Sequence, residues 1–218
     1  MRSPLVLAVL AAGMLAALPL NAADGPIARV PVEANPADPD ARALLDTYRA
    51  RGQPINLNLV SAISPKLAKA RGELTRAIRY ESVVPRPLRE LTILRTAQLM
   101  GGEYEIHQHS VAALACGFSQ AQLDALAHWS TGELFSEKQR ALLAYLDEAV
   151  GREGEVSDKT FAELSRQFST REIVEVTMIA AQYMGTSMFT NALRVRIDGS
   201  GTLSAIVLGP CWSFGPQK

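Results

Sequence analysis

The sequence has few cysteines, no surplus of charge and only one long apolar run. Its two cysteines, Cys116 and Cys211, lie too far apart to form one short paired motif of the kind that binds metal or exchanges disulfides. An oxidising compartment would permit a bridge between them. Lys plus Arg and Asp plus Glu each number 22 in 218 residues, so the formal net charge is zero. Without a basic surplus to hold a phosphate backbone, we expect no nucleic-acid binding.

The apolar run lies at the N-terminus. Arg2 precedes the run Leu5–Leu18, and small residues follow within Pro19–Ala23, as in a signal-peptidase site. The run is shorter than the ~20 apolar residues that a membrane-spanning helix needs. We interpret residues 1–23 as a Sec-type signal peptide and expect a periplasmic or secreted protein with no membrane attachment after cleavage. An uncleaved anchor is the alternative.

Prolines and apolar periodicity divide the rest of the chain. Four prolines within residues 24–39 predict an extended leader. Residues 40–198 carry apolar side chains at helical spacing and predict one all-α domain. The glycine-rich tail, residues 199–218, is expected to be irregular or to contain one short strand at 203–208. Helices are expected at residues 40–51, 64–80, 88–99, 103–116, 119–128, 136–150, 157–168 and 170–195.

Two acidic residues and a histidine form the best candidate for chemistry. Glu105 and His109 are four apart on one helix, so they share a face and can exchange a proton. The Gly101-Gly102 turn would let the preceding helix fold back and bring Glu90 toward that face. Such a group in a partly apolar pocket would have the shifted proton affinities that acid/base catalysis needs. A Glu/His surface pair is the alternative interpretation.

Three neighbouring residues are secondary candidates. His107 points to a different side of the helix from His109, so no metal site is expected unless the helix is distorted. The hydroxyl of Tyr104 can either reach the pocket or pack. Cys116 can be a nucleophile, although a buried cysteine usually behaves as a small apolar residue.

Three runs of sequence resemble the carboxymuconolactone decarboxylase family, which includes the alkyl hydroperoxidase AhpD. They are RELTILR at 89–95, GGEYEIHQH at 101–109 and ACGFS at 115–119. The resemblance implies an AhpD-like bundle of about six to eight helices. It also implies a homo-oligomer, commonly a trimer or hexamer. The apolar residues within 173–195 can form its interface or, as the alternative, belong to the internal core.

The resemblance also assigns roles to individual positions. In the AhpD-like branch a Glu, a CxxC pair and a His form a proton-relayed thiol site. Matching the His to His109 puts the relay Glu at Glu90 and the two cysteine positions at Gly102 and Glu105. Peroxide reduction through a disulfide has therefore lost both sulfurs at the usual place. The decarboxylase branch, by contrast, implies no metal or organic cofactor.

These observations favour a cofactor-independent lyase or isomerase that acts on a small oxygenated acid or lactone. His109 would be the general acid/base, with Glu105 and Glu90 orienting it or relaying its proton. One alternative is a peroxidase or antioxidant enzyme that uses Cys116. The other is a binding protein without catalytic activity.

Overall fold

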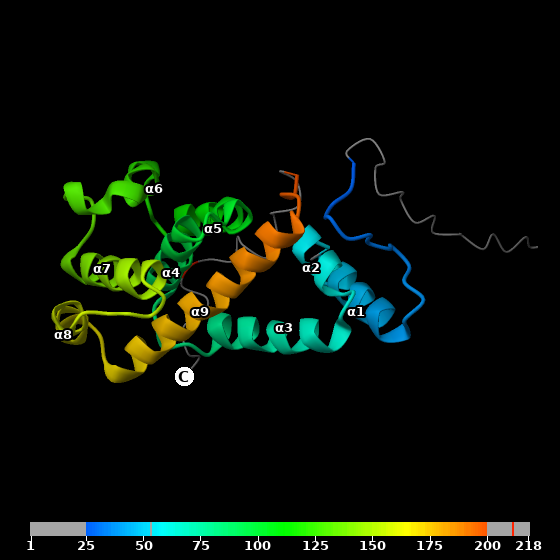
Figure 1. Ribbon diagram of the computed structural model, residues 1–218, viewed down its shortest axis with the longest axis horizontal. Coiled ribbons are helices and arrows are strands. Elements are labelled where there is room, and N and C mark those ends of the chain that lie inside the picture. Colours follow the sequence, from blue (N-terminus) through cyan, green and yellow to red (C-terminus); the bar gives the residue numbers. More distant parts are fainter. Residues whose placement is uncertain (1–24, 53, 200–210, 212–218) are drawn as a thin grey trace, which may run out of the picture.

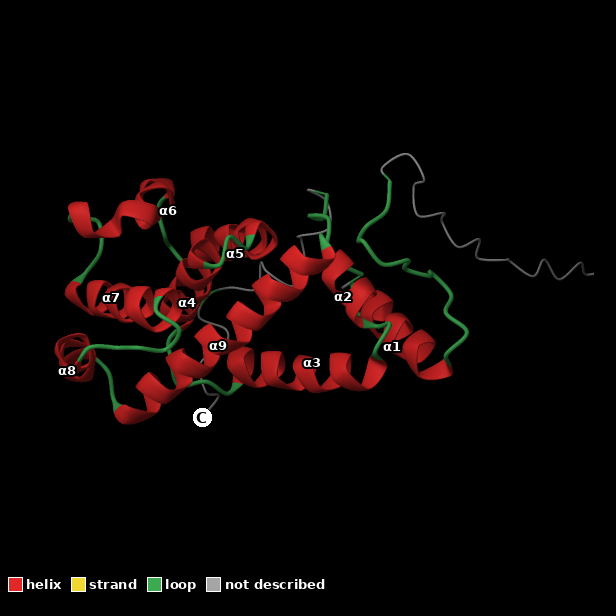
Figure 2. Cartoon of the chain, viewed as in Figure 1, coloured by secondary structure: helices red, strands yellow, loops and turns green. Residues whose placement is uncertain are grey.

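The computed structural model describes residues 25–52, 54–199 and 211. This part of the chain forms nine α-helices and one 3-10 helix and contains no β-strand, so the predicted all-α class is confirmed (Figure 2). The elements are α1 (Pro39–Ala50), α2 (Asn56–Ser61), α3 (Pro65–Tyr80), α4 (Arg86–Leu99), α5 (Glu103–Ala115), α6 (Gln120–Ala125), η2 (Leu126–Thr131), α7 (Glu137–Gly151), α8 (Asp158–Gln167) and α9 (Thr170–Leu193).

Serine capping boxes begin three helices in the second half of the chain. Ser119, Ser136 and Ser169 each accept a hydrogen bond from the backbone N–H three residues later. The Gln or Glu at that later position accepts in return from the serine's own N–H, which completes a capping box. Helices α1, α3 and α4 have a proline in the first turn. Proline lacks a backbone N–H, but an N–H in the first turn has no partner within the helix, so no helical hydrogen bond is lost. The helix starts predicted at these serines are confirmed.

α4 is the central helix of the molecule. Residues 88–97 are all buried, and α4 packs against α5, α7 and α9. Leu91 and Leu94 enter the main apolar core, while Ile93 packs with Tyr183 in a second cluster. Because neighbours enclose it on every side, α4 holds its polar side chains on a fixed backbone.

α9 and α3 frame one side of the molecule. α9 runs diagonally across the fold, α3 lies along one side of it, and α1 and α2 close the far end of α3 (Figure 1). A small cluster that includes Leu44, Tyr48 and Ala68 joins α1 to α3. α9 continues without a break through Gly185. The helices α1, α2 and α3 thus form one wall of a cavity, and α5 and α9 form the other wall.

Two details differ from the sequence-based expectation. The six-residue helix α2 was not predicted, because it is too short to show a period. The helix expected at 119–128 ends at Ala125 and passes into η2, where His128 has the non-helical angles φ −125° and ψ 31°. The predicted signal peptide and the possible strand at 203–208 lie outside the described residues. None of the described helices combines the length and the hydropathy that crossing a membrane requires.

Candidate active site

The tight turn between α4 and α5 brings the predicted residues together. Gly101 takes a φ of 60°, a left-handed conformation that suits glycine, and the chain then reverses into α5. At Gly102 a side chain would overlap the hydroxyl of Ser187 on α9 and would place its Cβ 2.8 Å from the Ser187 Cβ. The absence of a side chain at Gly102 therefore lets α5 lie close against α9, with its Glu105/His109 face toward α4.

His109 lies between two carboxylates. Its Nδ1 is 2.7 Å from Oε2 of Glu90, and its Nε2 is 3.5 Å from Oε2 of Glu105. Oε1 of Glu90 accepts a hydrogen bond of 3.2 Å from Nε of Arg86. The ring of Tyr183 packs edge-on against the imidazole, with ring centres 5.0 Å apart. The structure thus brings Glu90, Glu105 and His109 into one group.

The positive charge of His109 and the negative charges of the two carboxylates stabilise one another. Burial lowers the pKa of His109, but the carboxylates of Glu90 and Glu105 outweigh that effect and raise the pKa to about 9. Burial alone would raise the pKa of Glu90, whereas His109 and Arg86 hold it below its usual value. At neutral pH the group is therefore an imidazolium between carboxylates, in which Nδ1 donates a hydrogen bond to Glu90 and Nε2 forms a longer ion pair with Glu105.

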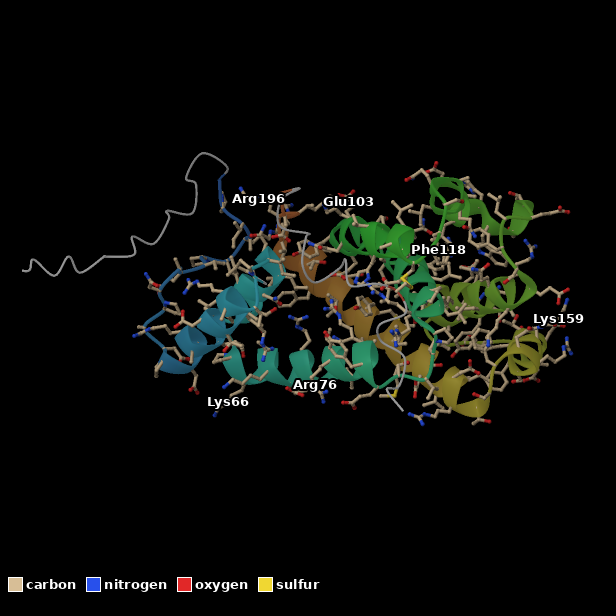
Figure 3. The ribbon with its side chains drawn as sticks, turned by 180° about the vertical axis from the view of Figure 1, so that it is seen from behind. Lys66, Arg76, Glu103, Phe118, Lys159 and Arg196 are labelled. Carbon is tan, nitrogen blue, oxygen red and sulfur yellow. A yellow bond between two sulfur atoms is a disulfide. The ribbon has the colours of Figure 1, made fainter. Side chains whose placement is uncertain are left out.

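A cavity of about 470 Å³ opens beside this group, between the wall of α1, α2 and α3 and the wall of α5 and α9. Glu105 and His109 both line it. Oε1 of Glu105 is buried and has no hydrogen-bond partner in the described structure. Figure 3 shows the side chains of α3, on which Arg76 is labelled, and of α9 facing the space between the two helices. Glu105 thus combines a place in the cavity wall with a carboxylate oxygen that no described protein group hydrogen-bonds.

Tyr104 lines the cavity, but its hydroxyl is already engaged. It donates a short hydrogen bond to Oδ2 of Asp198 and accepts one of 3.2 Å from the N–H of Leu57. Burial and the Asp198 carboxylate raise its pKa far above the usual value. Gln108 donates to the same Asp198 oxygen at 2.9 Å. Tyr104 therefore connects α5 to α2 and to the segment after α9.

The other two secondary candidates lie away from this chemistry. Cys116, at the end of α5, is bonded to Cys211 in a disulfide that joins positions 95 residues apart, so neither thiol is free. His107 does not line the cavity, and its Nε2 is buried without a partner. Among the described residues, no group of three or more His, Cys, Asp or Glu side chains is arranged to hold a metal ion.

Several residues of the site were not predicted from the sequence. Arg86 precedes Glu90 by four positions on α4, a spacing that could have identified it as an ion-pair partner. Tyr183 belongs to α9 and Asp198 follows that helix, so only the tertiary fold brings them near α5. No local pattern marks either of them.

The chain resembles known proteins in sequence over part of its length and in fold over most of it. Residues 65–148 match the Carboxymuconolactone decarboxylase family. No curated protein sequence matches the chain.

Three solved structures have a similar fold. An alkylhydroperoxidase AhpD core protein from Ralstonia eutropha JMP134, described as an uncharacterized peroxidase-related protein, has a TM-score of 0.69 at 20% identity, over 85% of this chain and 98% of its own. The debrominase Bmp8 has a TM-score of 0.62 at 19% identity, over 84% of this chain and 99% of its own. A protein of unknown function from Agrobacterium tumefaciens has a TM-score of 0.61 at 22% identity, over 65% of this chain and 97% of its own. At these identities the similarity concerns the fold.

Proposed function

We propose that this chain, whose residues 65–148 match the Carboxymuconolactone decarboxylase family, is a cofactor-independent acid/base lyase or isomerase for a small oxygenated acid or lactone. The observation that carries the proposal is the His109 imidazolium, held between Glu90 and Glu105 at the wall of a cavity. A proton donor that is charged at neutral pH suits a reaction in which an enolate must be protonated. We also propose that the protein is exported and acts as a homo-oligomer.

The chemistry follows from which group carries the proton. In a decarboxylation the bond to the carboxyl carbon breaks, carbon dioxide leaves, and the electron pair passes to a neighbouring carbonyl as an enolate. The Glu105 carboxylate lines the cavity and has its Oε2 3.5 Å from Nε2 of His109, so it is placed to pass the imidazolium proton to the enolate carbon. Glu90 holds the opposite nitrogen and stabilises the charged ring. A proton from water then restores the imidazolium.

In an isomerisation Glu105 acts first as a base and then as an acid. The Glu105 carboxylate takes a proton from the carbon next to the carbonyl and returns it to a different carbon of the same enolate. No redox step is needed in either reaction. The disulfide that binds Cys116 and Cys211 leaves the chain without a free thiol for a peroxidase reaction in this state.

A proton-exchange assay tests this proposal. Purified protein in deuterium oxide is incubated with a panel of small oxo-acids and lactones, and NMR follows both loss of the carboxyl group and incorporation of deuterium. For an active compound, His109→Ala should lower the rate by about 10²–10⁴-fold, which is the usual contribution of a general acid/base. His128→Ala is the matched control, because His128 is exposed and far along the chain in η2. Undiminished turnover by His109→Ala would refute the assignment.

A further inference from the structure

One face of α3 presents arginines to the cavity. Arg71, Thr75 and Arg79 recur every four residues, so they lie along one face of the helix, and all three line the cavity. They stand on the wall opposite α5 and α9, which carry His109 and Tyr183. A ligand in the cavity would therefore lie between this face of α3 and the acid/base group.

Among the described residues, Arg71 and Arg79 have no acidic partner. Nη2 of Arg71 makes only long hydrogen bonds of 3.4 Å to Asn58 and Ser61, and its Nε is buried with no partner. Within the described part of the chain, neither Arg71 nor Arg79 forms an ion pair. Arg76, between them in the sequence and half exposed, instead pairs with Glu73 at 3.1 Å and with Glu81 at 2.7 Å.

The cavity as a whole has an excess of positive charge. Its acidic side chains are already engaged, Glu73 with Arg76 and Glu105 with His109. Its basic side chains are Arg51, Lys69, Arg71, Arg76 and Arg79, in addition to the imidazolium. A guanidinium that is partly removed from water without a partner is costly, and an anion from solution would supply the missing partner.

Tyr183 shows that both guanidiniums act close to the acid/base group. Burial raises the pKa of Tyr183, while the positive charges of Arg79 and Arg71 oppose that rise. Since the Tyr183 ring packs against His109, both charges lie within electrostatic reach of the place where we expect the reaction.

We propose that Arg71 and Arg79 bind a carboxylate of the substrate and so select small carboxylic acids. The acid is then held so that a carbon other than that of the bound carboxylate lies against Glu105 and His109. The planar guanidinium of arginine matches a carboxylate with two parallel hydrogen bonds, which fits an Arg71 Nε that has no partner of its own. Gln182 lines the same cavity, and its side-chain amide can donate hydrogen bonds to further oxygens. This inference rests on the proposed function, because it names the substrate class for that site.

Paired acids and amides test the charge requirement. Binding of 4-oxopentanoate, glutarate and benzoate, and of their neutral amides, is titrated against the full chain with the His109 ring signals as the NMR reporter. We expect at least one acid to bind at least tenfold more tightly than its amide. Arg71→Gln and Arg79→Gln should each weaken that acid about tenfold and leave the amide unchanged. Lys66→Gln is the matched control, because Lys66 is an exposed charge on the same helix that does not line the cavity, and it should bind as the wild type does.

Several outcomes would overturn the inference. They are equal binding of acids and amides, no binding of any acid at millimolar concentration, or undiminished acid binding by both the Arg71 and Arg79 variants, each first shown by circular dichroism to be folded. Failure of the proposed function gives a different pattern. In that case His109→Ala would keep its turnover, while Arg71→Gln would still lose affinity for the acid and not for the amide.

Discussion

His109 has its unusual charge because two different helices supply its partners. Glu105 comes from its own helix α5 and Glu90 from α4, and Arg86 fixes the far oxygen of Glu90. The nearly complete burial of the ring would by itself favour the neutral form. The contact with Glu90, at 2.7 Å, is the shorter of the two and should contribute most of the stabilisation of the imidazolium.

Replacing Glu90 by Gln should therefore lower the pKa of His109 from about 9 toward or below its ordinary value of 6.5. The amide keeps the size of the side chain but removes the negative charge beside Nδ1. NMR titration of the imidazole signals measures this pKa directly. His107→Gln, on the same helix, serves as the control and should leave it unchanged. A His109 pKa that stays near 9 in Glu90→Gln would show that Glu105 alone sets the charge.

Only part of this group could be predicted from the sequence. The spacing of four between Glu105 and His109 fixes a shared helix face, and the glycine turn allows Glu90 to approach it. Tyr183 and Asp198 could not be predicted, because their positions depend on where α9 and the segment after it pack. Arg71 and Arg79 share a face of α3 in the sequence too, but only the fold shows that this face borders the cavity.

At the scale of elements, α5 owes its place to its contact with α9. At Gly102 the Ser187 side chain of α9 occupies the space that a Cβ would need. The resemblance discussed above places one member of a thiol pair at this same position. A cysteine at position 102 would thus require α9 to move or Ser187 to change.

Gly102→Ala should accordingly destabilise the protein, by about 1–3 kcal/mol, the usual cost of overpacking a well-packed site. The backbone φ of −84° at Gly102 suits any residue, so the loss would come from the clash alone. Urea unfolding measures the change. In the double variant with Ser187→Gly, the loss of unfolding free energy should be smaller than the sum of the losses in the two single variants. Gly185→Ala is the control, since no atom lies within 4 Å of its added Cβ, and it should stabilise α9 slightly.

Helix boundaries were predictable where local chemistry marks them and not elsewhere. The serine caps at Ser136 and Ser169 and the prolines in the first turns define their helices from neighbouring residues alone. α2 has neither a side-chain cap nor enough length for a period, and its first residue is held by Asp198, which is 142 positions away. Its position depends on that distant contact, so the local sequence does not contain it.

At the scale of the whole molecule, the charge of His109 should appear as a pH dependence of stability. Its pKa in the folded protein, about 9, lies above the ordinary value of 6.5, so the folded state binds this proton more tightly than the unfolded chain does. The resulting stabilisation is complete below pH 6.5 and is lost as the pH rises through 9. Urea unfolding at pH 6, 7.5 and 9 should therefore show that the difference in free energy of unfolding between the wild type and His109→Gln becomes smaller as the pH rises. A difference that is constant with pH would contradict the raised pKa.

The disulfide makes the second half of the chain a closed ring. Cys116 ends α5 and Cys211 lies beyond α9, so α6, α7, α8 and α9 all belong to the covalent loop between them. A single protease cut in the exposed turn at residues 151–155 would consequently release no fragment. The two pieces would remain one molecule of slightly increased mass, because cleavage adds a water, and they would separate only after reduction.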